Sequence, residues 1–255
     1  MITRSRCLST CLATIALSLM ICSCENRHPG SPQVSNTRPA TQLIIRAIVA
    51  GADLQYDSLF HDSVSRAFVV TDFRYYISNI KGIRDDGTEH RAPRAVLLIN
   101  PGRKGYDIGP LPVGAYKAIR FTLGLDSATN HSDPTVFDTT NPLAIQTPSM
   151  HWDWNSGYLF MKLEGRVDTT IKGTGVPATE FFYHLGMDGM ERTIDLPLKF
   201  LIGTSSADTV RVKFDLAILL ACVDMRVETS THSFDNHALA ARMADRWQAA
   251  FSVDK

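Results

Sequence analysis

The sequence predicts a mainly β domain, an antiparallel β-sandwich or barrel-like fold with an amphipathic helix at its C-terminus. Three observations predict this class. After residue 43, hydrophobic and polar residues alternate with period two, which is the pattern of half-buried strands. Proline and glycine turns separate these segments, as in all-β domains. Near the C-terminus alone, the hydrophobic period becomes that of a helix.

The first 23 residues have the pattern of an export signal. Two arginines precede an apolar run over residues 12–21, and Ser23 stands directly before Cys24. The apolar run is too short to span a bilayer as a mature helix. The string Ile21-Cys22-Ser23-Cys24 resembles a bacterial lipobox, in which Cys24 becomes the lipidated first residue. We therefore expect a lipid-anchored protein of the bacterial cell envelope, facing the periplasm or the cell surface; a soluble secreted protein cleaved nearby is the alternative.

Residues 24–42 are rich in proline, serine, asparagine and threonine, and they predict a flexible tether before a domain over residues 43–255. With the signal removed and Cys24 lipidated, Cys222 is the one cysteine left, so no intramolecular disulfide is expected. Cys222 lies in an apolar run and is predicted to be a small packing residue. The 26 basic residues balance the 26 acidic ones, which argues against a nucleic-acid partner.

Within the domain, the strands follow from local patterns. Residues 43–49 and 67–70 are short apolar runs, and residues 73–83 and 94–99 predict two strands around a turn at Asp86-Gly87. Alternation also predicts strands over residues 119–125, 194–200 and 210–218, and a further strand is expected over residues 157–165. In contrast, the apolar residues from Leu239 to Phe251 form a single helical stripe, for which Ser233 or Asp235 is the expected N-cap.

The sequence contains none of the common local motifs of enzymes. It has no Gly-x-Ser-x-Gly elbow, no glycine-rich phosphate loop before a lysine and no His-Glu-x-x-His pair. We therefore expect no catalytic residues and no enzymatic activity.

Three segments in the middle of the chain carry imidazole side chains. Imidazole is a common ligand for copper and zinc, and a neighbouring thioether such as Met150 would suit Cu(I). Each of these residues also has a plain structural interpretation, as a hydrogen-bonded or packed core side chain. The residues are His131 in the first segment, His151, Trp152 and Trp154 in the second, and His184 in the third.

The order and spacing of these segments resemble the MbnP-like copper-binding protein family. The resemblance extends from about residue 43 to residue 253, and is carried by Phe73-Arg74-Tyr75-Tyr76-Ile77-Ser78-Asn79-Ile80, Gly124-Leu125-Asp126-Ser127 before Asn130-His131, Met150-His151-Trp152-Asp153-Trp154-Asn155-Ser156-Gly157-Tyr158, Lys162-Leu163-Glu164-Gly165 and His184-Leu185-Gly186.

This resemblance implies a predominantly β protein that binds copper for acquisition or buffering. In the family, the site combines histidines with a tryptophan that a partner dihaem peroxidase of the MauG-like type oxidises to kynurenine. Carried over by motif, the ligands are His131 and His184, and the oxidised ring is Trp152 or Trp154. The family pattern has an aromatic residue at His151, so His151 is either an added ligand or an aromatic substitute.

An alternative function is a metal-free envelope module that binds a sugar or another ligand. Trp152, Trp154 and Tyr158 would then form an aromatic platform for stacking. A weaker alternative is a calcium site on Asp126, Asn130 and Asp133, although the spacing lacks the glycine and the glutamate of an EF-hand loop.

Overall fold

The computed structural model describes residues 39–103, 105–152, 156–173 and 175–254. The predicted signal peptide, lipidated Cys24, most of the predicted tether and Trp154 therefore lie outside the described residues. By internal contacts the chain divides into residues 1–37 and 38–255, and the described helices and strands all lie in the second unit.

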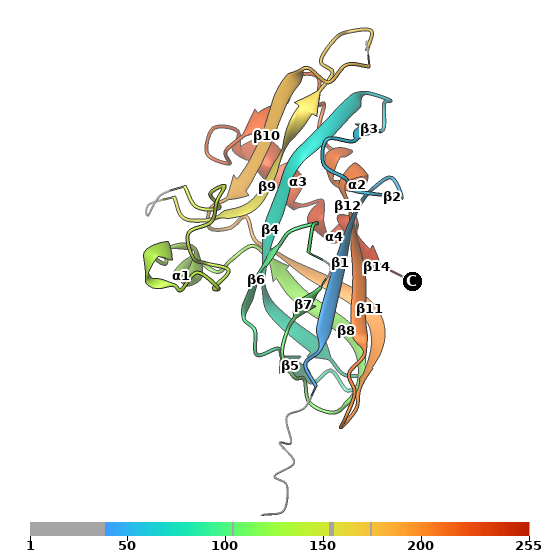
Figure 1. Cartoon of the computed structure of the whole chain (residues 1–255), viewed down its shortest axis with the longest axis vertical. Coiled ribbons are helices and arrows are strands. Elements are labelled where there is room, and N and C mark those ends of the chain that lie inside the picture. Colours follow the sequence, from blue (N-terminus) through green and yellow to red (C-terminus); the bar gives the residue numbers. More distant parts are fainter. Residues whose placement is uncertain (1–38, 104, 153–155, 174, 255) are drawn as a thin grey trace, which may run out of the picture. The chain divides into compact units, whose positions relative to one another are not determined.

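The smaller of two sheets contains the first and last strands of the domain (Figure 1). In the described residues its order is β14-β12-β1-β2, and β7 also pairs with β1. The pairing of β1 with β12 is parallel, which the expectation of an antiparallel fold did not include. The bounds are β1 Gln42–Val49, β2 Ala52–Asp53, β7 Tyr106–Asp107, β12 Thr209–Asp215 and β14 Phe251–Val253.

The larger sheet is built around one long strand, β4 (Ala67–Ile83), which joins two of the predicted segments. Its order in the described residues is β11-β8-β4-β9-β10-β13, and three short strands also pair with β4. The pairing of β10 with β13 is parallel and the others are antiparallel. The bounds are β3 Leu59–His61, β5 Glu89–Arg91, β6 Val96–Ile99, β8 Gly114–Leu123, β9 Leu159–Val167, β10 Thr179–Gly186, β11 Arg192–Ile202 and β13 Ser230–Thr231.

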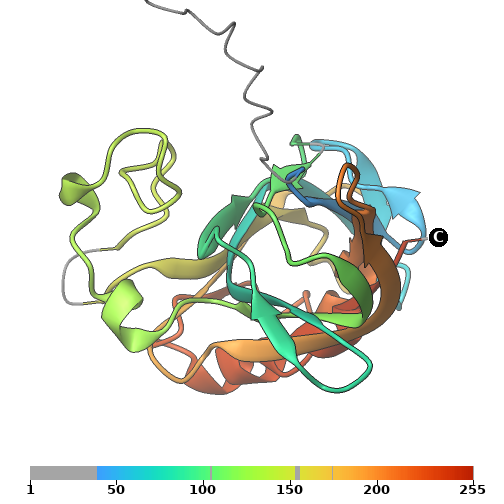
Figure 2. The same cartoon turned by 90° about the horizontal axis from the view of Figure 1, so that it is seen from below.

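The two sheets meet through buried aromatic rings. Phe73 and Tyr75 on β4 each lie 5.3 Å from the ring of Phe214 on β12, and Phe251 on β14 lies 4.7 Å from Phe214. Seen from below, the strands curve around this core (Figure 2). The predicted fold class, mainly β and sandwich-like with helix at the C-terminus, is confirmed.

The helices differ from the sequence prediction at two places. The strand predicted over residues 210–218 ends at Asp215, whose carboxylate caps α2 (Leu216–Leu220) by accepting from the Ala217 N–H at 2.9 Å. The C-terminal stripe forms two helices, α3 (His237–Ala244) and α4 (Trp247–Ala250), before β14. Asn236 caps α3, in place of Ser233 or Asp235. Both errors arise because an apolar stripe fixes which face is buried but not where a backbone changes direction.

Two short helices lie in the long connection between β8 and β9, which extends away from the sheets in Figure 2. They are α1 (Ser127–Asn130) and a 3-10 helix (Pro134–Val136). The carboxylates of Asp126 and Asp133 cap them, so these two residues shape turns rather than a calcium site. No helix among the described residues is long and apolar enough to cross a membrane.

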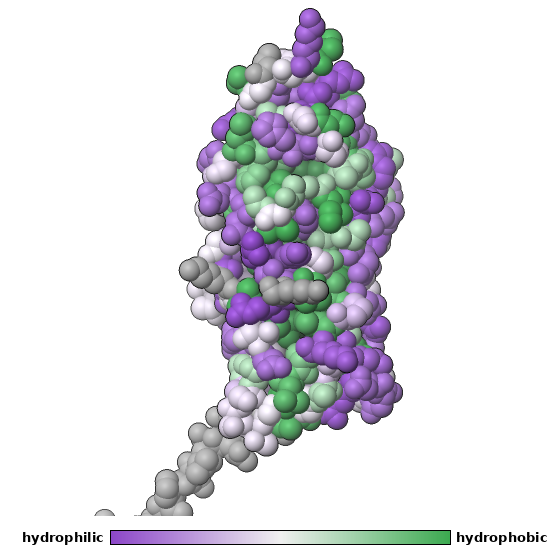
Figure 3. Space-filling model, turned by 90° about the vertical axis from the view of Figure 1, so that its right-hand side faces the viewer, coloured by the Kyte–Doolittle hydropathy of each residue, from purple (hydrophilic) through white to green (hydrophobic). Residues whose placement is uncertain are grey.

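The surface near β2 and β3 is partly apolar. Figure 3, which shows the right-hand side of the view in Figure 1, has hydrophobic residues between polar margins. Exposed apolar side chains in this part of the sequence include Tyr56, Leu59 and Val64.

Cys222 is half-buried and its thiol donates to the Leu219 carbonyl at 3.3 Å, as expected of a packing residue.

Candidate functional site

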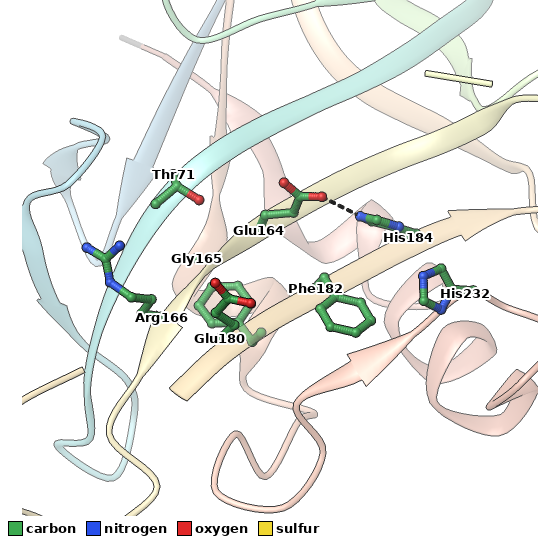
Figure 4. A pocket seen from close by; sticks show the side chains of 9 residues that line it. Thr71, Glu164, Gly165, Arg166, Glu180, Phe182, His184 and His232 are labelled. Atoms are coloured by element: carbon green, nitrogen blue, oxygen red, sulfur yellow. Dashed lines mark hydrogen bonds and ion pairs between the residues drawn. The ribbon is translucent and has the colours of Figure 1, made fainter. Parts of the chain in front are cut away.

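A polar cavity of about 340 Å³ lies on the outer face of β9 and β10 (Figure 4). Strand alternation creates this face, because Phe181, Tyr183 and Leu185 point into the core while Phe182 and His184 point outward. The cavity lining includes Thr71, Glu164, Glu180, Phe182, His184 and His232.

Four charged side chains form a network on β4 and β9 beside this cavity. Asp72 stands opposite Glu164, and Arg74 stands opposite Lys162, so like charges face each other across the strands. Opposite charges contact each other diagonally, from one strand to the next, and also along each strand. Lys162 Nζ lies 3.2 Å from Asp72 Oδ2 and 3.1 Å from Glu164 Oε1, and Arg74 Nη2 lies 2.6 Å from Asp72 Oδ2. The Lys162 side chain is only 9% exposed, so these partners compensate a desolvated charge.

His184 is the next member of this network. Its Nε2 lies 2.7 Å from Glu164 Oε1. Burial lowers the pKa of His184 below its ordinary value, although the hydrogen bond with Glu164 acts in the opposite direction. A buried imidazole with a lowered pKa is neutral at pH 7, which is the form that can bind a metal.

His232 lies beside His184, and sequence reasoning did not select it. The parallel register pairs Phe182 with Ser230 and Tyr183 with Thr231, which brings the following His232 next to His184. The two imidazole centroids are 5.1 Å apart in an edge-to-face arrangement. His232 Nδ1 lies 3.0 Å from Asp235 Oδ2. Because β13 has only two residues, no local alternation marks this segment as a strand, so the sequence carries little signal for His232.

Trp152 approaches the same region from the β8–β9 connection. Its ring packs on Gly186 at the end of β10, where a Cβ would lie 2.7 Å from Trp152 Cζ3. Trp152 also contacts Phe234 edge-to-face at 5.7 Å, and Phe234 stacks on His232 at 6.0 Å. Phe234 is 61% exposed. The structure therefore connects Trp152 to the two histidines through one aromatic ring.

The indole nitrogen of Trp152 is buried, and it has no hydrogen-bond partner in the described part of the chain. An unsatisfied buried N–H is uncommon and destabilising, so a residue that carries one is a candidate for a functional role.

His131 lies in a different network. Its Nε2 is 3.3 Å from Asp188 Oδ2, in the turn that follows β10. The carboxylate of Asp188 also accepts from Ser127 and Asn130, and these hydrogen bonds, that of Ser127 first, lower the pKa of Asp188. Among the described hydrogen bonds and ring contacts, none joins His131 to His184 or to Trp152.

The remaining predicted residues are packed. His151 lies edge-to-face on Tyr158 at 4.7 Å, which is the contact of an aromatic side chain. Tyr158 is buried and its hydroxyl donates to the Leu143 carbonyl at 2.7 Å. It therefore cannot belong to an exposed aromatic platform, which corrects that alternative. Met150 is buried in the hydrophobic core, so its thioether is committed to packing.

No group of three or more His, Cys, Asp or Glu side chains in the described ranges could hold a metal ion. The histidine pair thus offers two imidazole nitrogens as its strongest donors. A metal that needs more ligands must take them from water or from a modified side chain.

Comparison with known proteins adds the family. A family model described as MbnP matches residues 38–237. The solved structure of MbnP from Methylosinus trichosporium is similar with a TM-score of 0.58 and 17% sequence identity, over 76% of this chain and 83% of that one. At this identity, the structural match shows a shared fold. No curated protein matches the sequence.

Proposed function

Because the chain belongs to the MbnP family, we propose that it is a copper-binding lipoprotein of the bacterial cell envelope that acquires or buffers copper and catalyses no reaction of its own. Its site is the pair of His184 and His232, with Trp152 beside it. The single observation that carries this proposal is the 5.1 Å distance between the two imidazole centroids beside the cavity, with Trp152 linked to His232 by the ring of Phe234.

The donor set fits copper. Two imidazoles supply nitrogen ligands for Cu(I), and the carboxylates of Glu164 and Asp235 are already engaged with the rings. Intact tryptophan has only an N–H donor and no lone pair for a metal. Peroxide, the oxidant of a peroxidase, would add two oxygen atoms across the C2–C3 bond of the Trp152 indole, and hydrolysis would then release C2 as formate. The kynurenine that results carries an aromatic amine, which is a ligand that the histidine pair lacks.

From the family resemblance we propose that a partner dihaem peroxidase of the MauG-like type carries out this oxidation. Trp152 is only partly buried and contacts the exposed ring of Phe234, so it lies close to solvent, as oxidation by a partner protein requires. Cys24 carries the lipid that anchors the protein to the membrane. Trp154 is the other ring that the oxidase could modify.

The test is metal analysis with intact and tryptic mass spectrometry on protein purified from its native host, which supplies the oxidase. We expect near-stoichiometric copper and an oxygen-containing modification on Trp152. His184→Ala and His232→Ala should each lose copper, whereas His131→Ala, whose ring faces Asp188, is the matched control and should keep it.

Two results would contradict the proposal. Loss of copper in His131→Ala with retention in His232→Ala would return the ligand role to His131 and His184. Protein without copper and with intact tryptophans would mean that this chain keeps the fold without the metal function.

A further inference from the structure

Each imidazole of the histidine pair has one nitrogen committed to a carboxylate, and the committed nitrogens differ. His184 uses Nε2 toward Glu164 Oε1 at 2.7 Å, and His232 uses Nδ1 toward Asp235 Oδ2 at 3.0 Å. Neither His184 Nδ1 nor His232 Nε2 has a hydrogen-bond partner among the described residues. Figure 4 shows the His184 ring between Glu164 and His232.

These contacts decide where the protons of the neutral rings lie. An ionised carboxylate accepts hydrogen bonds and cannot donate them, so the ring nitrogen that faces it must carry the proton. His184 is then protonated on Nε2, and His232 on Nδ1. The lone pairs are left on Nδ1 of His184 and on Nε2 of His232. An unconstrained histidine disfavours the Nδ1–H form, so His232 needs its carboxylate to hold it there.

Both carboxylates are themselves held in place. Glu164 Oε1 also contacts the buried ammonium of Lys162 at 3.1 Å. Asp235 Oδ1 accepts the backbone N–H of His232 at 2.7 Å, which leaves Oδ2 for the ring. Each histidine therefore has a fixed partner, as metal-ligating histidines commonly have.

We propose that Glu164 and Asp235 are positioning residues that lock His184 and His232 in opposite tautomers, so that one ring presents Nδ1 and the other Nε2 to the metal. This inference rests on the proposed copper function, because it assigns the donor atoms of that site. The two tautomers already differ in the metal-free protein.

The experiment uses the 15N-labelled full chain without metal. Two-bond 1H–15N correlation spectra at about pH 8, above the ordinary histidine pKa of about 6.5, give the tautomer of each ring. Spectra of His184→Ala and His232→Ala each lack the signals of one ring and so assign both. We expect Nε2–H for His184 and Nδ1–H for His232. If His232 carries its proton on Nε2, or His184 on Nδ1, the inference is overturned whether or not the protein binds copper.

Asp235→Asn tests the cause. Its Oδ1 can still accept the His232 backbone N–H, but its amide nitrogen now donates toward the ring, so the His232 proton should move to Nε2. Asp224→Asn is the matched control, because Asp224 also accepts a backbone N–H in the same part of the chain and contacts no histidine. An unchanged His232 tautomer in Asp235→Asn would refute the role of Asp235.

Copper titration of protein from the native host distinguishes a failure of the tautomer assignment from a failure of the proposed copper function. With the tautomer moved, copper affinity should fall about 10–100-fold in Asp235→Asn and stay unchanged in Asp224→Asn. If wild-type protein shows the expected tautomers and binds no copper, the proposed function fails and the tautomer assignment stands. If Asp235→Asn switches the tautomer and binds copper as tightly as wild type, Nε2 of His232 is not a ligand atom, which contradicts the donor assignment.

Discussion

Asn130 joins three segments of the chain that are far apart in sequence, and its removal is a sharp test of the architecture around the site. Its side chain is fully buried. Oδ1 accepts the backbone N–H of Tyr158 at 2.9 Å, and Nδ2 donates to Asp188 Oδ1 at 2.9 Å. Asn130 thus ties α1 to the segment after Trp152 and to the turn after β10.

In Asn130→Ala, the Tyr158 N–H loses its acceptor inside the protein. A buried polar group without a partner costs about 1–3 kcal/mol, and a small void adds to this. The loss on the Asp188 side is smaller, because the Asp188 side chain is 46% exposed and water can replace the amide. We therefore expect the free energy of unfolding to fall by about 2–3 kcal/mol.

The assay is urea unfolding followed by circular dichroism. With an m-value of about 2 kcal/mol/M, the midpoint should fall by about 1 M with little change in slope. Asp188→Ala should cost about 1–2 kcal/mol, because the buried Asn130 amide loses its acceptor while the exposed Ser127 and His131 can bond to water. Asp133→Ala is the control, because that carboxylate caps only its own exposed turn. A larger loss in Asp188→Ala than in Asn130→Ala would refute the central role of the asparagine.

Three further predictions concern other parts of the fold. Gly165→Ala places a Cβ 1.9 Å from a carbonyl oxygen of β4, so we expect a loss of about 3 kcal/mol or more in urea unfolding, whereas Gly102→Ala, with its nearest atom at 3.4 Å, should be nearly neutral. Hydrogen bonds lower the pKa of Asp188, so the folded protein binds fewer protons than the unfolded chain; stability should fall as the pH drops below about 4, and less so in Asp188→Asn. Trp152→Phe removes a buried N–H without a partner among the described residues and keeps a ring over Gly186, so the free energy of unfolding should change by less than about 2 kcal/mol. Metal analysis and mass spectrometry of this variant should find neither copper nor kynurenine. If copper is retained and Trp154 is modified, the oxidised ring is Trp154.

The sequence by itself determined the elements whose signals are local. Alternation in residues 119–125, 194–200 and 210–215 corresponds to strands β8, β11 and β12, because one face of each strand is buried and neighbouring residues must alternate. The order and spacing of motifs also indicated the MbnP family, which the family model confirms. His184 and Trp152 were selected for the same reason, since each lies in a motif of adjacent residues.

Tertiary structure alone decided which of these residues meet. His232 follows a two-residue strand, and it reaches His184 only through the parallel pairing of β10 with β13, a contact between segments about 50 residues apart. His131 and Tyr158 belong to conspicuous motifs, yet one faces Asp188 and the other is buried under the loop. Periodicity is encoded by neighbours in sequence, whereas the partner of a strand depends on how the whole core packs, so a site assembled across strands is not visible in any one segment.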